Sequence, residues 1–598
     1  MYYLSFQLHI IQLLFIVWIL VVVMSLFNNS GNENYFSMWL HYDIDSDLQF
    51  VMFNGITILY MLLTVYTMRR HSPKKHYKAG KRTLFLTEIP KNADEHDLKW
   101  HFEQNYTNSR VLDARICYDV AQLVSLETKR KKAQNKKKFF IDQQRKENVD
   151  SVINPKTCGR ICCCFKACKK VEAVDYYTKL EADLTDKCRK EQLNAVKKPL
   201  GMAFVTFENE SMVKEIFYKL PNNAPKPSNL WNGQCLDRRT VFYAPPPQNV
   251  YWENLSVTCW WGRWFIINCA VLLVLFFLTT YIILICLELD FNNNTRDNLC
   301  FLAILLLWNY TNLVPIIASL STFLEAHWTR PRENVIMMHK CYVYLLIMVL
   351  ILPSFESSSG STSLPTNISF FVNYVMIAAF VGNAMDMLRI SWLLEYVICL
   401  SLAHSAKERQ NITRDQVYEF QYGQNYAWIT AIFALVMTYS FTCPILILLG
   451  LVYMLMKYCV DSFNLYYSYQ PKKLDMKIHS GAVCQAMAAP LMCTCWLLFF
   501  NYVHLGISWS FLITIINFVC VIGAWSYFES NPDTHNYKFD SQGVDEMETT
   551  QAAQRQLYFP QVLQDQQDPE KGDSGNKDEE DLFSQNENFL SDKDKLIF

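Results

Sequence analysis

The sequence LHIIQLLFIVWILVVVMSLF fills residues 8–27 and contains no Asp, Glu, Lys or Arg. An α-helix rises about 1.5 Å per residue, so about 20 apolar residues cross the roughly 30 Å hydrocarbon core of a bilayer. Similar runs recur along the 598 residues and alternate with polar loops. This distribution excludes a fibrous, disulfide-scaffold or fully soluble protein, and it predicts a polytopic α-helical membrane protein.

Ten segments approach the length of a membrane span. They are Leu8–Phe27, Leu48–Met68, Trp260–Leu289, Leu299–Leu324, Cys341–Pro353, Ile368–Leu400, Tyr426–Phe441, Pro444–Tyr467, Gly481–Val503 and Gly506–Phe528. The fifth segment is short, and only Thr442 and Cys443 separate the seventh from the eighth. We predict about ten spans.

Basic residues follow the even-numbered spans, and Lys and Arg are enriched in cytoplasmic loops. They include Arg69, Arg70, Lys74, Lys75, Arg330, Arg332, Lys407, Arg409, Arg414, Lys472, Lys473 and Lys477. Both termini and the polar block 69–258 are therefore expected in the cytosol. The Asn-x-Ser/Thr sequons at Asn28, Asn293 and Asn367 fall in predicted outside loops and are candidate glycosylation sites.

The sequence divides into parts of different composition. They are two N-terminal spans in 1–68, a cytosolic domain in 69–258, spans 3–7 in 259–441, spans 8–10 in 442–530 and an acidic cytosolic tail, predicted to be disordered, in 531–598. The end of the tail resembles an acidic dileucine-type sorting signal formed by Asp592, Leu596 and Ile597. We expect the plasma membrane first, and an endosomal or lysosomal membrane second.

The cytosolic block has the pattern of a small α+β domain. Strands are predicted at 83–89, 110–117, 201–207 and 239–243, and helices at 94–106 and 210–220. The order β-α-β-β-α-β is ferredoxin-like, which is also the order of the RNA-recognition motif (RRM). Phe85 and Phe204 occupy stacking positions, but Leu200 and Met202 replace a basic and an aromatic residue of that motif. We interpret the block as an RRM-like docking domain that binds no nucleic acid, with RNA binding as the alternative.

An insertion between the second and third of these strands is helical in pattern and strongly basic. It carries Lys129–Lys132 and Lys136–Lys138, either as a solvated charged helix or as a surface for anionic lipid. A cysteine cluster follows, formed by Cys158, Cys162, Cys163, Cys164 and Cys168. S-palmitoylation, zinc binding and unmodified thiols are the alternatives for this cluster. We expect no metal or other cofactor, because no paired CxxC spacing is present.

Seven short stretches resemble the animal transmembrane protein 63 family, which is related to the plant hyperosmolality-gated, calcium-permeable channels. They are RTLF (82–85), KPLGMAFVTF (198–207), APPPQNVYWENL (244–255), FLEAHWT (323–329), FFVNY (370–374), GNAMDMLR (382–389) and KIHSGA (477–482). The resemblance extends from about Tyr2 to about Tyr537. It departs from the family pattern in two places, because the family's first helix is absent and the loop between the fifth and sixth spans is shortened.

The resemblance implies a stress-gated cation channel and no enzyme. In this family the cytosolic RRM-like domain lies between the second and third helices of the core ten, and the five helices that here run from Trp260 to Phe441 conduct ions. The implied partners are membrane lipids and permeant calcium, sodium and potassium ions, and the implied state is a monomer. We expect tension to favour a state in which the fourth and sixth spans separate and a hydrophobic neck becomes wet.

Polar residues inside the predicted spans are candidates for lining the pore or forming its gate, because they are costly in lipid. The candidates are Asn268, Asn309, Asn312, Ser319, Thr322, Asn373, Tyr374, Gly382, Asn383, Asp386 and Thr438. In a continuous helix Asn383 and Asp386 share one face. Asp386 is expected to meet water, a cation or a partner such as Arg389, and Gly382 either bends the helix or allows close packing.

Two other classes of protein remain open at this stage. A phospholipid scramblase, or a mixed conduit for ions and lipids, would use a polar groove that opens to the bilayer. A non-conducting membrane scaffold would use the cytosolic domain to bind a partner, and it is the reading to prefer if the missing N-terminal helix is essential for conduction.

Overall fold

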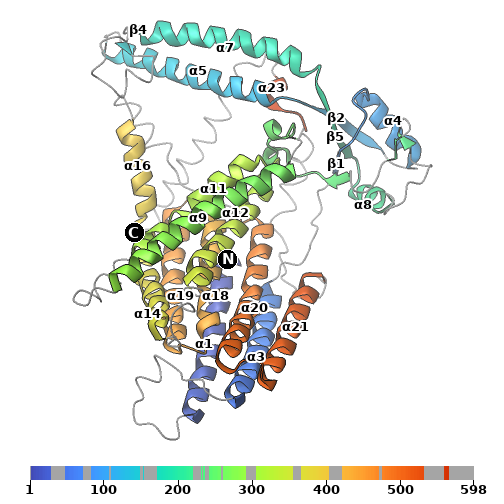
Figure 1. Cartoon of the computed structure of the whole chain (residues 1–598). Coiled ribbons are helices and arrows are strands. Elements are labelled where there is room, and N and C mark those ends of the chain that lie inside the picture. The colour runs from blue at the N-terminus through green and yellow to red at the C-terminus, as the bar shows by residue number, and fades with distance from the viewer. Residues whose placement is uncertain are drawn as a thin grey trace, which may run out of the picture. The chain divides into compact units, whose positions relative to one another are not determined.

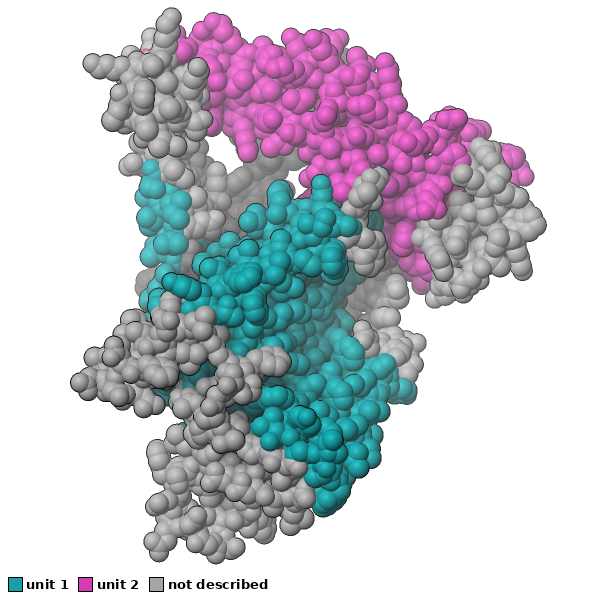
Figure 2. Space-filling view, in the orientation of Figure 1, with its two compact units in different colours: residues 1–77, 259–541 teal, residues 78–258, 542–598 magenta. Residues whose placement is uncertain are grey.

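The structure is a computed structural model, and it forms two compact units (Figure 2). It describes residues 2–28, 47–71, 82–106, 110–147, 152–153, 171–219, 230–231, 234–235, 241–257, 260–290, 305–353, 365–402, 420–469, 474–530 and 558–564. Unit 1 consists of residues 1–77 and 259–541, and unit 2 consists of residues 78–258 and 542–598.

Unit 1 is a bundle of helices (Figure 1). Its elements are α1 (Tyr2–Asn28), α3 (Asp47–His71), α9 (Trp260–Asp290), α11 (Val314–Glu325), α12 (Arg330–Leu345), η5 (Leu346–Ile351), α14 (Pro365–Ile377), η6 (Ala378–Gly382), α15 (Asn383–Leu388), α16 (Ile390–Leu402), α18 (Tyr422–Tyr439), α19 (Ile445–Phe463), η7 (Asn464–Ser468), α20 (Met476–Leu505) and α21 (Trp509–Ser530).

Within the described residues, eight helical stretches are long and apolar enough to cross a membrane. They are Tyr2–Val23, Phe50–Arg69, Gly262–Tyr281, Arg330–Ile351, Phe370–Leu388, Ile445–Ser468, Met476–Val503 and Trp509–Tyr527. The predicted fourth and seventh spans, which overlap α11 and α18, are not among them. The total of ten spans therefore stays a prediction.

Helix α18 is the centre of unit 1. Almost every side chain from Tyr426 to Tyr439 is buried, as is typical of a helix that is apolar on all sides. It packs against α12, α19 and α20. Gly450 allows α19 to approach closely, because a Cβ atom at that position would lie 2.6 Å from the Val436 Cγ2 atom of α18. The polar residues of α18 therefore lie inside protein, where neighbouring helices can bond them.

The sixth predicted span is not a continuous helix. Its first part is α14, followed by the π-helix η6 and then α15, which ends at Leu388. Arg389 has a left-handed φ of 52°, which breaks the chain direction before α16 begins. The expectation of one span from Ile368 to Leu400 is therefore wrong at its end. The fifth span begins earlier than predicted, because its apolar helical stretch starts at Arg330 rather than at Cys341.

Unit 2 contains a four-stranded antiparallel sheet with the strand order β2-β5-β1-β8. The strands are β1 (Thr83–Leu86), β2 (Val111–Tyr118), β5 (Pro199–Phe207) and β8 (Val241–Tyr243), and the helices between them are α4 (Glu95–Asn105) and α8 (Glu210–Lys219). Asp94 caps α4 by accepting a hydrogen bond from the Glu95 backbone N–H at 2.8 Å. Alternate residues of β5, such as Ala203, Val205 and Phe207, are buried in one apolar core with residues of both helices. The sheet therefore has a second face, which carries Phe85 and Phe204.

The insertion between β2 and β5 is a helical hairpin of α5 (Ala121–Glu147) and α7 (Ala173–Ala195) (Figure 1). Lys137 of the basic run binds Glu181 of α7 at 3.0 Å. Short strands β3 (Val152–Ile153) and β4 (Val171–Glu172) pair near its tip. The cysteine cluster at 158–168 lies outside the described residues, so its state stays a prediction.

Unit 2 is completed by one more short strand pairing, by two 3₁₀ turns and by a part of the tail. β6 (Leu230–Trp231) pairs with β7 (Gln234–Cys235), and the 3₁₀ turns η3 (Pro247–Asn249) and η4 (Trp252–Asn254) follow β8. The tail was predicted to be disordered throughout, but residues 558–564 are placed on unit 2 and end in the short helix α23 (Gln561–Gln564). The apolar residues Tyr558, Phe559 and Leu563 explain why this part packs.

Candidate functional site

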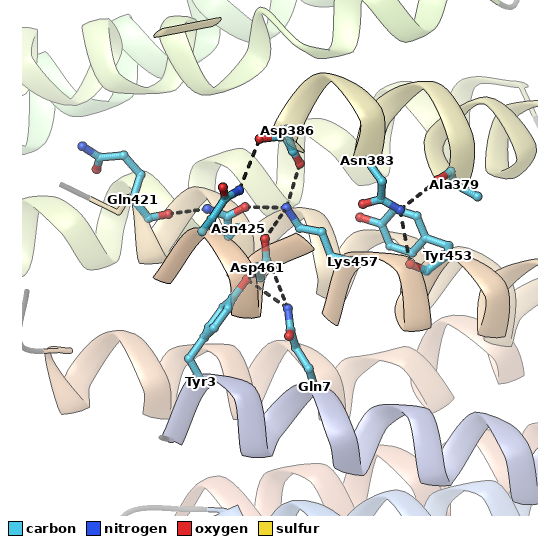
Figure 3. Close-up of polar contacts among 11 residues, drawn as sticks. Tyr3, Gln7, Ala379, Asn383, Asp386, Gln421, Asn425, Tyr453, Lys457 and Asp461 are labelled. Atoms are coloured by element: carbon cyan, nitrogen blue, oxygen red, sulfur yellow. Dashed lines mark hydrogen bonds and ion pairs between the residues drawn. The ribbon is translucent and has the colours of Figure 1, made fainter. Parts of the chain in front are cut away.

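A buried ionic cluster joins the sixth, seventh and eighth predicted spans to α1 (Figure 3). The ammonium of Lys457 on α19 donates to Asp386 Oδ2 and to Asn425 Oδ1, each at 2.8 Å, and lies 3.0 Å from Asp461 Oδ1. Asp461 Oδ2 accepts from the Tyr3 hydroxyl at 2.6 Å and from Gln7 Nε2 at 2.7 Å. We call these six residues the Lys457 cluster.

One end of the Lys457 cluster is buried, and the other end is exposed. The side chains of Lys457 and Asp461 are 3% and 1% exposed, whereas that of Asp386 is 53% exposed. A buried charge is tolerated only when it is paired and hydrogen-bonded, and Lys457 has three oxygen partners. Two carboxylates around one ammonium give the cluster a formal charge of −1, and Asp386 is the carboxylate at its exposed end.

Asn383 lies one turn before Asp386 and also faces α19 (Figure 3). Its Nδ2 donates to Ala379 O at 2.9 Å and to Tyr453 O at 3.4 Å. Its Oδ1 atom is buried, and the described residues supply it with no hydrogen-bond donor. A buried oxygen that receives no hydrogen bond is a position where a water molecule or a cation can bind.

Arg389 does not take the role that the sequence suggested for it. The carboxylate of Asp386 binds Lys457, which comes from another helix, and the Arg389 guanidinium lies 5.6 Å from the centre of the Trp392 ring. The left-handed backbone of Arg389 ends the helix on which Asp386 lies, so a same-face contact between residues three apart is lost.

A second buried ionic cluster joins the third, fourth and fifth spans. Glu325, just after the apolar run of α11, binds Lys340 of α12 and accepts from Asn268 Nδ2 of α9 at 2.6 Å. Its other carboxylate oxygen lies 2.8 Å from His327 Nε2. Lys340 also donates to Ser321 Oγ at 2.8 Å. We call these five residues the Glu325 cluster, and they bind α9, α11 and α12 to one another.

The fourth and sixth spans meet through fewer polar contacts. The Thr311 hydroxyl lies 3.2 Å from the Tyr374 hydroxyl, and both side chains are buried. About two turns further along α14 and η6, a Cβ atom on Gly382 would lie 3.3 Å from Trp308 Cζ2. We call these four residues the 4–6 contact. Gly382 therefore permits close packing in this structure, and it also ends a π-helix.

An apolar cavity adjoins the 4–6 contact. Tyr374 lines it together with residues of α12, η5 and α18, which are Leu345, Leu346, Val349, Leu350, Trp428, Ala431, Ile432 and Leu435. It is too small for more than about one water molecule, and its lining is mostly apolar. This region is closed to ions in the conformation described.

The remaining candidates from the sequence do not join one site. Asn309 and Ser319 are exposed, and Asn309 donates to Leu305 O of its own helix. Asn312 and Asn373 are half-buried. Thr322 and Thr438 are buried and donate to backbone oxygens one turn earlier in their own helices, at 2.7 Å each. The sequence candidates thus separate into the Glu325 cluster, the 4–6 contact, the Lys457 cluster and isolated positions.

Several residues of these clusters were missed by sequence reasoning. They are Tyr3, Gln7, Trp308, Glu325, His327, Lys340, Asn425, Lys457 and Asp461. Lys457 and Asp461 could have been identified from the sequence. They are charged residues four positions apart inside the apolar run Pro444–Tyr467, where charges are costly unless they are paired. Glu325 and Lys340 lie just beyond the predicted span ends, where charged residues are ordinary.

Other predicted sites lie where the structure gives no side-chain information. Asn28 and Asn367 fall in the helical ends of α1 and α14, but their side chains are not described, and Asn293 and the sorting residues Asp592, Leu596 and Ile597 lie outside the described residues. Among the residues that are described, no group of three or more His, Cys, Asp or Glu is placed to hold a metal ion.

The fold and these clusters define a class: a polytopic membrane protein whose helical unit carries buried ionic clusters and whose second unit is a cytosolic α+β domain. Residues 81–254 match the family described as "Cytosolic domain of 10TM putative phosphate transporter", and residues 299–508 match "Calcium-dependent channel, 7TM region, putative phosphate".

Three curated relatives match most of the chain. The mechanosensitive cation channel TMEM63B of Gallus gallus is 42% identical, over 100% of this chain and 82% of its own length. The mechanosensitive cation channel TMEM63A of Mus musculus is 34% identical, over 94% and 77%. The osmosensitive cation channel TMEM63C of Danio rerio is 37% identical, over 88% and 69%. The chain belongs to the transmembrane protein 63 (TMEM63) family, as its sequence motifs predicted.

Proposed function

We propose that this protein is a mechanically or osmotically gated cation channel, permeable to calcium, whose pore is formed by spans 3–7 and whose gate lies between spans 4 and 6. The family membership supports the activity, since the relatives are named mechanosensitive and osmosensitive cation channels. One observation carries the proposed position of the gate. Within unit 1, buried ion pairs join the spans inside two groups, whereas only the 4–6 contact provides a polar contact between spans 4 and 6 among the described residues.

Two groups of spans are each held together by buried charges. The Glu325 cluster binds α9, α11 and α12, and the Lys457 cluster binds α15, α18, α19 and α1. Breaking a buried ion pair by removing one partner typically costs about 3–5 kcal/mol. Separating the helices within either group is therefore costly.

The 4–6 contact between these groups is weaker. A hydroxyl–hydroxyl bond within a membrane protein contributes about 0.6 kcal/mol on average. Among the described residues, α11 packs mainly on α9 and α12, so the helical turn at 305–311 carries the contact to the sixth span. Tension favours the state with the larger in-plane area, and parting the fourth span from the sixth at the 4–6 contact breaks no buried ion pair and leaves the packing of α12 on α18 in place.

The chemistry at Asp386 suits cations. Its half-exposed carboxylate lies at the exposed end of the Lys457 cluster, whose formal charge is negative, and nearby Asn383 offers an amide oxygen to which the described residues bring no donor. Oxygen ligands and negative charge replace part of the hydration of a permeating cation. Permeability to calcium, sodium and potassium follows from the same oxygen chemistry. Wetting of the apolar cavity beside Tyr374 would connect this site to the rest of the path.

The finer features of the architecture belong to the same proposal. The strand order β2-β5-β1-β8 and the two helices between the strands support a ferredoxin-like, RRM-like fold for the cytosolic unit. We place the protein in the plasma membrane, with endosomal or lysosomal membranes as the alternative, as a glycosylated monomer in contact with membrane lipids.

Purified protein in liposomes under graded membrane tension tests the function. Discrete cation currents that rise with tension support a channel. Exchange of fluorescent lipid between leaflets without such currents would assign it as a scramblase, and both together would assign it as a mixed conduit. Neither activity, from protein that remains monodisperse, would contradict the proposal and favour a membrane scaffold.

A further inference from the structure

The second face of the sheet in unit 2 is covered by a distant part of the same chain. Phe85 of β1 and Phe204 of β5 are neighbours across the strands, with ring centres 4.8 Å apart. The Tyr558 ring stacks on Phe204, with centres 4.9 Å apart and planes inclined by 23°. Trp252 meets the same Phe204 ring edge-on at 5.6 Å.

Polar contacts fix the position and direction of this segment. The Tyr558 hydroxyl donates to Pro245 O at 2.9 Å, and burial raises the pKa of this phenol, which keeps it a donor. Gln192 Nε2 of α7 donates to Val562 O at 2.9 Å. The Arg115 guanidinium lies 5.6 Å from the centre of the Phe559 ring, within the range of a cation–π contact.

Apolar residues at the far end of the segment fill a second position. Leu563 is 7% exposed and belongs to one buried cluster with Val120, Leu123 and Cys188 at the base of the hairpin α5–α7. The segment thus reads Tyr-Phe-Pro-Gln-Val-Leu-Gln, with an aromatic anchor on the sheet and an aliphatic anchor on the hairpin. Short peptides with two such anchors commonly bind protein surfaces reversibly.

We propose that Tyr558–Gln564 is a docking motif that binds in cis and reversibly to the aromatic face formed by Phe85, Phe204 and Trp252, so that this face is a peptide-binding surface whose resident ligand is the protein's own tail. A linker raises the effective concentration of such a motif to the millimolar range, so even weak contacts keep the face occupied. A free peptide of the same pattern competes with the motif for this face.

The surface also explains why an RRM-like sheet here suits a peptide rather than a nucleic acid. A tyrosine side chain occupies the position over Phe204 where a base would stack. The neighbouring partners of the segment are a backbone carbonyl, a glutamine amide and apolar side chains, which match a peptide. Arg115 is the one cation that the described contacts place against the segment, and it is already paired with Asp113 at 3.1 Å.

Photocross-linking of the full-length protein tests this proposal. The photoreactive residue p-benzoylphenylalanine replaces Phe559, which leaves Tyr558 intact, and mass spectrometry locates the cross-link. We expect a cross-link to the β2 peptide that contains Arg115. An excess of a synthetic peptide spanning residues 555–567 is expected to lower its yield severalfold.

Two altered peptides provide matched controls that do not depend on folding of a variant protein. A peptide with Tyr558→Ala is expected to compete about tenfold less well, because it lacks the stacked ring and the hydrogen bond to Pro245. A peptide phosphorylated on that tyrosine is expected to fail as well, because its phosphate oxygens would face the Pro245 carbonyl oxygen without a donor.

Three results would overturn the proposal. A cross-link outside β2, or none, would show that the segment does not dock there. A β2 cross-link that excess peptide leaves unchanged would show a fixed part of the fold rather than a reversible motif. A single-stranded oligonucleotide that lowers the yield as strongly as the peptide would identify the face as a nucleic-acid surface.

Discussion

Replacing Tyr374 by phenylalanine tests whether the 4–6 contact holds the channel closed. Tyr374→Phe keeps the buried ring and removes only the hydroxyl that lies 3.2 Å from Thr311 Oγ1. Thr311 keeps its second bond, to Trp308 O at 2.7 Å, so no buried donor is orphaned. The variant therefore deletes one bond between the fourth and sixth spans with little other change.

The size of the effect follows from the free energy that this hydrogen bond contributes. Hydrogen bonds between membrane helices average about 0.6 kcal/mol and reach about 1.7 kcal/mol. If the bond exists only in the closed state, its loss multiplies the open-to-closed ratio by about 3, and by at most about 16. We expect a matching fall in the tension needed for half-maximal current.

Patch-clamp recording at graded pipette pressure measures this shift, with surface expression determined in parallel. Tyr342→Phe is the matched control, because it also removes a buried phenolic hydroxyl, which donates to Gln485 O at 3.3 Å between α12 and α20. An activation curve for Tyr374→Phe that coincides with wild type, or a shift equal to that of Tyr342→Phe, would refute the assignment of the gate to the 4–6 contact.

Three further changes test other parts of the molecule. Lys457→Met should lower stability in detergent by about 3 kcal/mol, because it leaves Asp461 buried without its cation. Asp461→Asn in the same chain should recover part of this loss in a thermal size-exclusion assay; no recovery contradicts the pairing. Ser319→Lys should raise basal leak, because Ser319 is exposed on α11 and a lysine there would draw water along it; unchanged leak at normal surface expression argues against a conduction path on that face. Burial lowers the pKa of His101 to about 4 from an unfolded value near 6.5. Between these two values the unfolded chain binds a proton that the folded chain does not, so the free energy of unfolding falls as the pH drops from about 6.5 towards 4. Unit 2 should lose about 2 kcal/mol between pH 7 and pH 5, measured by urea-dependent proteolysis of the full chain, and His101→Gln should flatten this dependence; an equal loss in the variant would exclude His101 as its source.

The secondary structure of unit 2 was largely predictable because its local signals agree. The run GMAFVTF at 201–207 reads as a buried strand and lies in β5, and Asp94 marks the start of α4 as an N-cap. The docking of 558–564 was not predictable, because a short apolar segment in an acidic tail has no periodicity that indicates which surface it contacts. Only the positions of Phe85 and Phe204 pointed to an aromatic face.

The spans were predictable as apolar runs, but their internal breaks were not. The π-helix at 378–382 packs against α19 and ends where Gly382 approaches Trp308, and neither it nor the left-handed backbone of Arg389 is marked by a local sequence pattern. Asn383 and Asp386 were identified because polar groups are costly in lipid. Their partners Tyr453 and Lys457 come from another span, and one sequence alone does not report such a pairing.

Cross-linking the fourth span to the sixth tests the central claim most directly. Trp308→Cys combined with Gly382→Cys places two thiols across the 4–6 contact, and a short reducible bifunctional reagent joins them. The account predicts that tension-activated current disappears when the bridge forms, as verified by mass spectrometry, and returns after reduction. Full tension-activated current through verified, cross-linked protein would contradict a gate between these two spans.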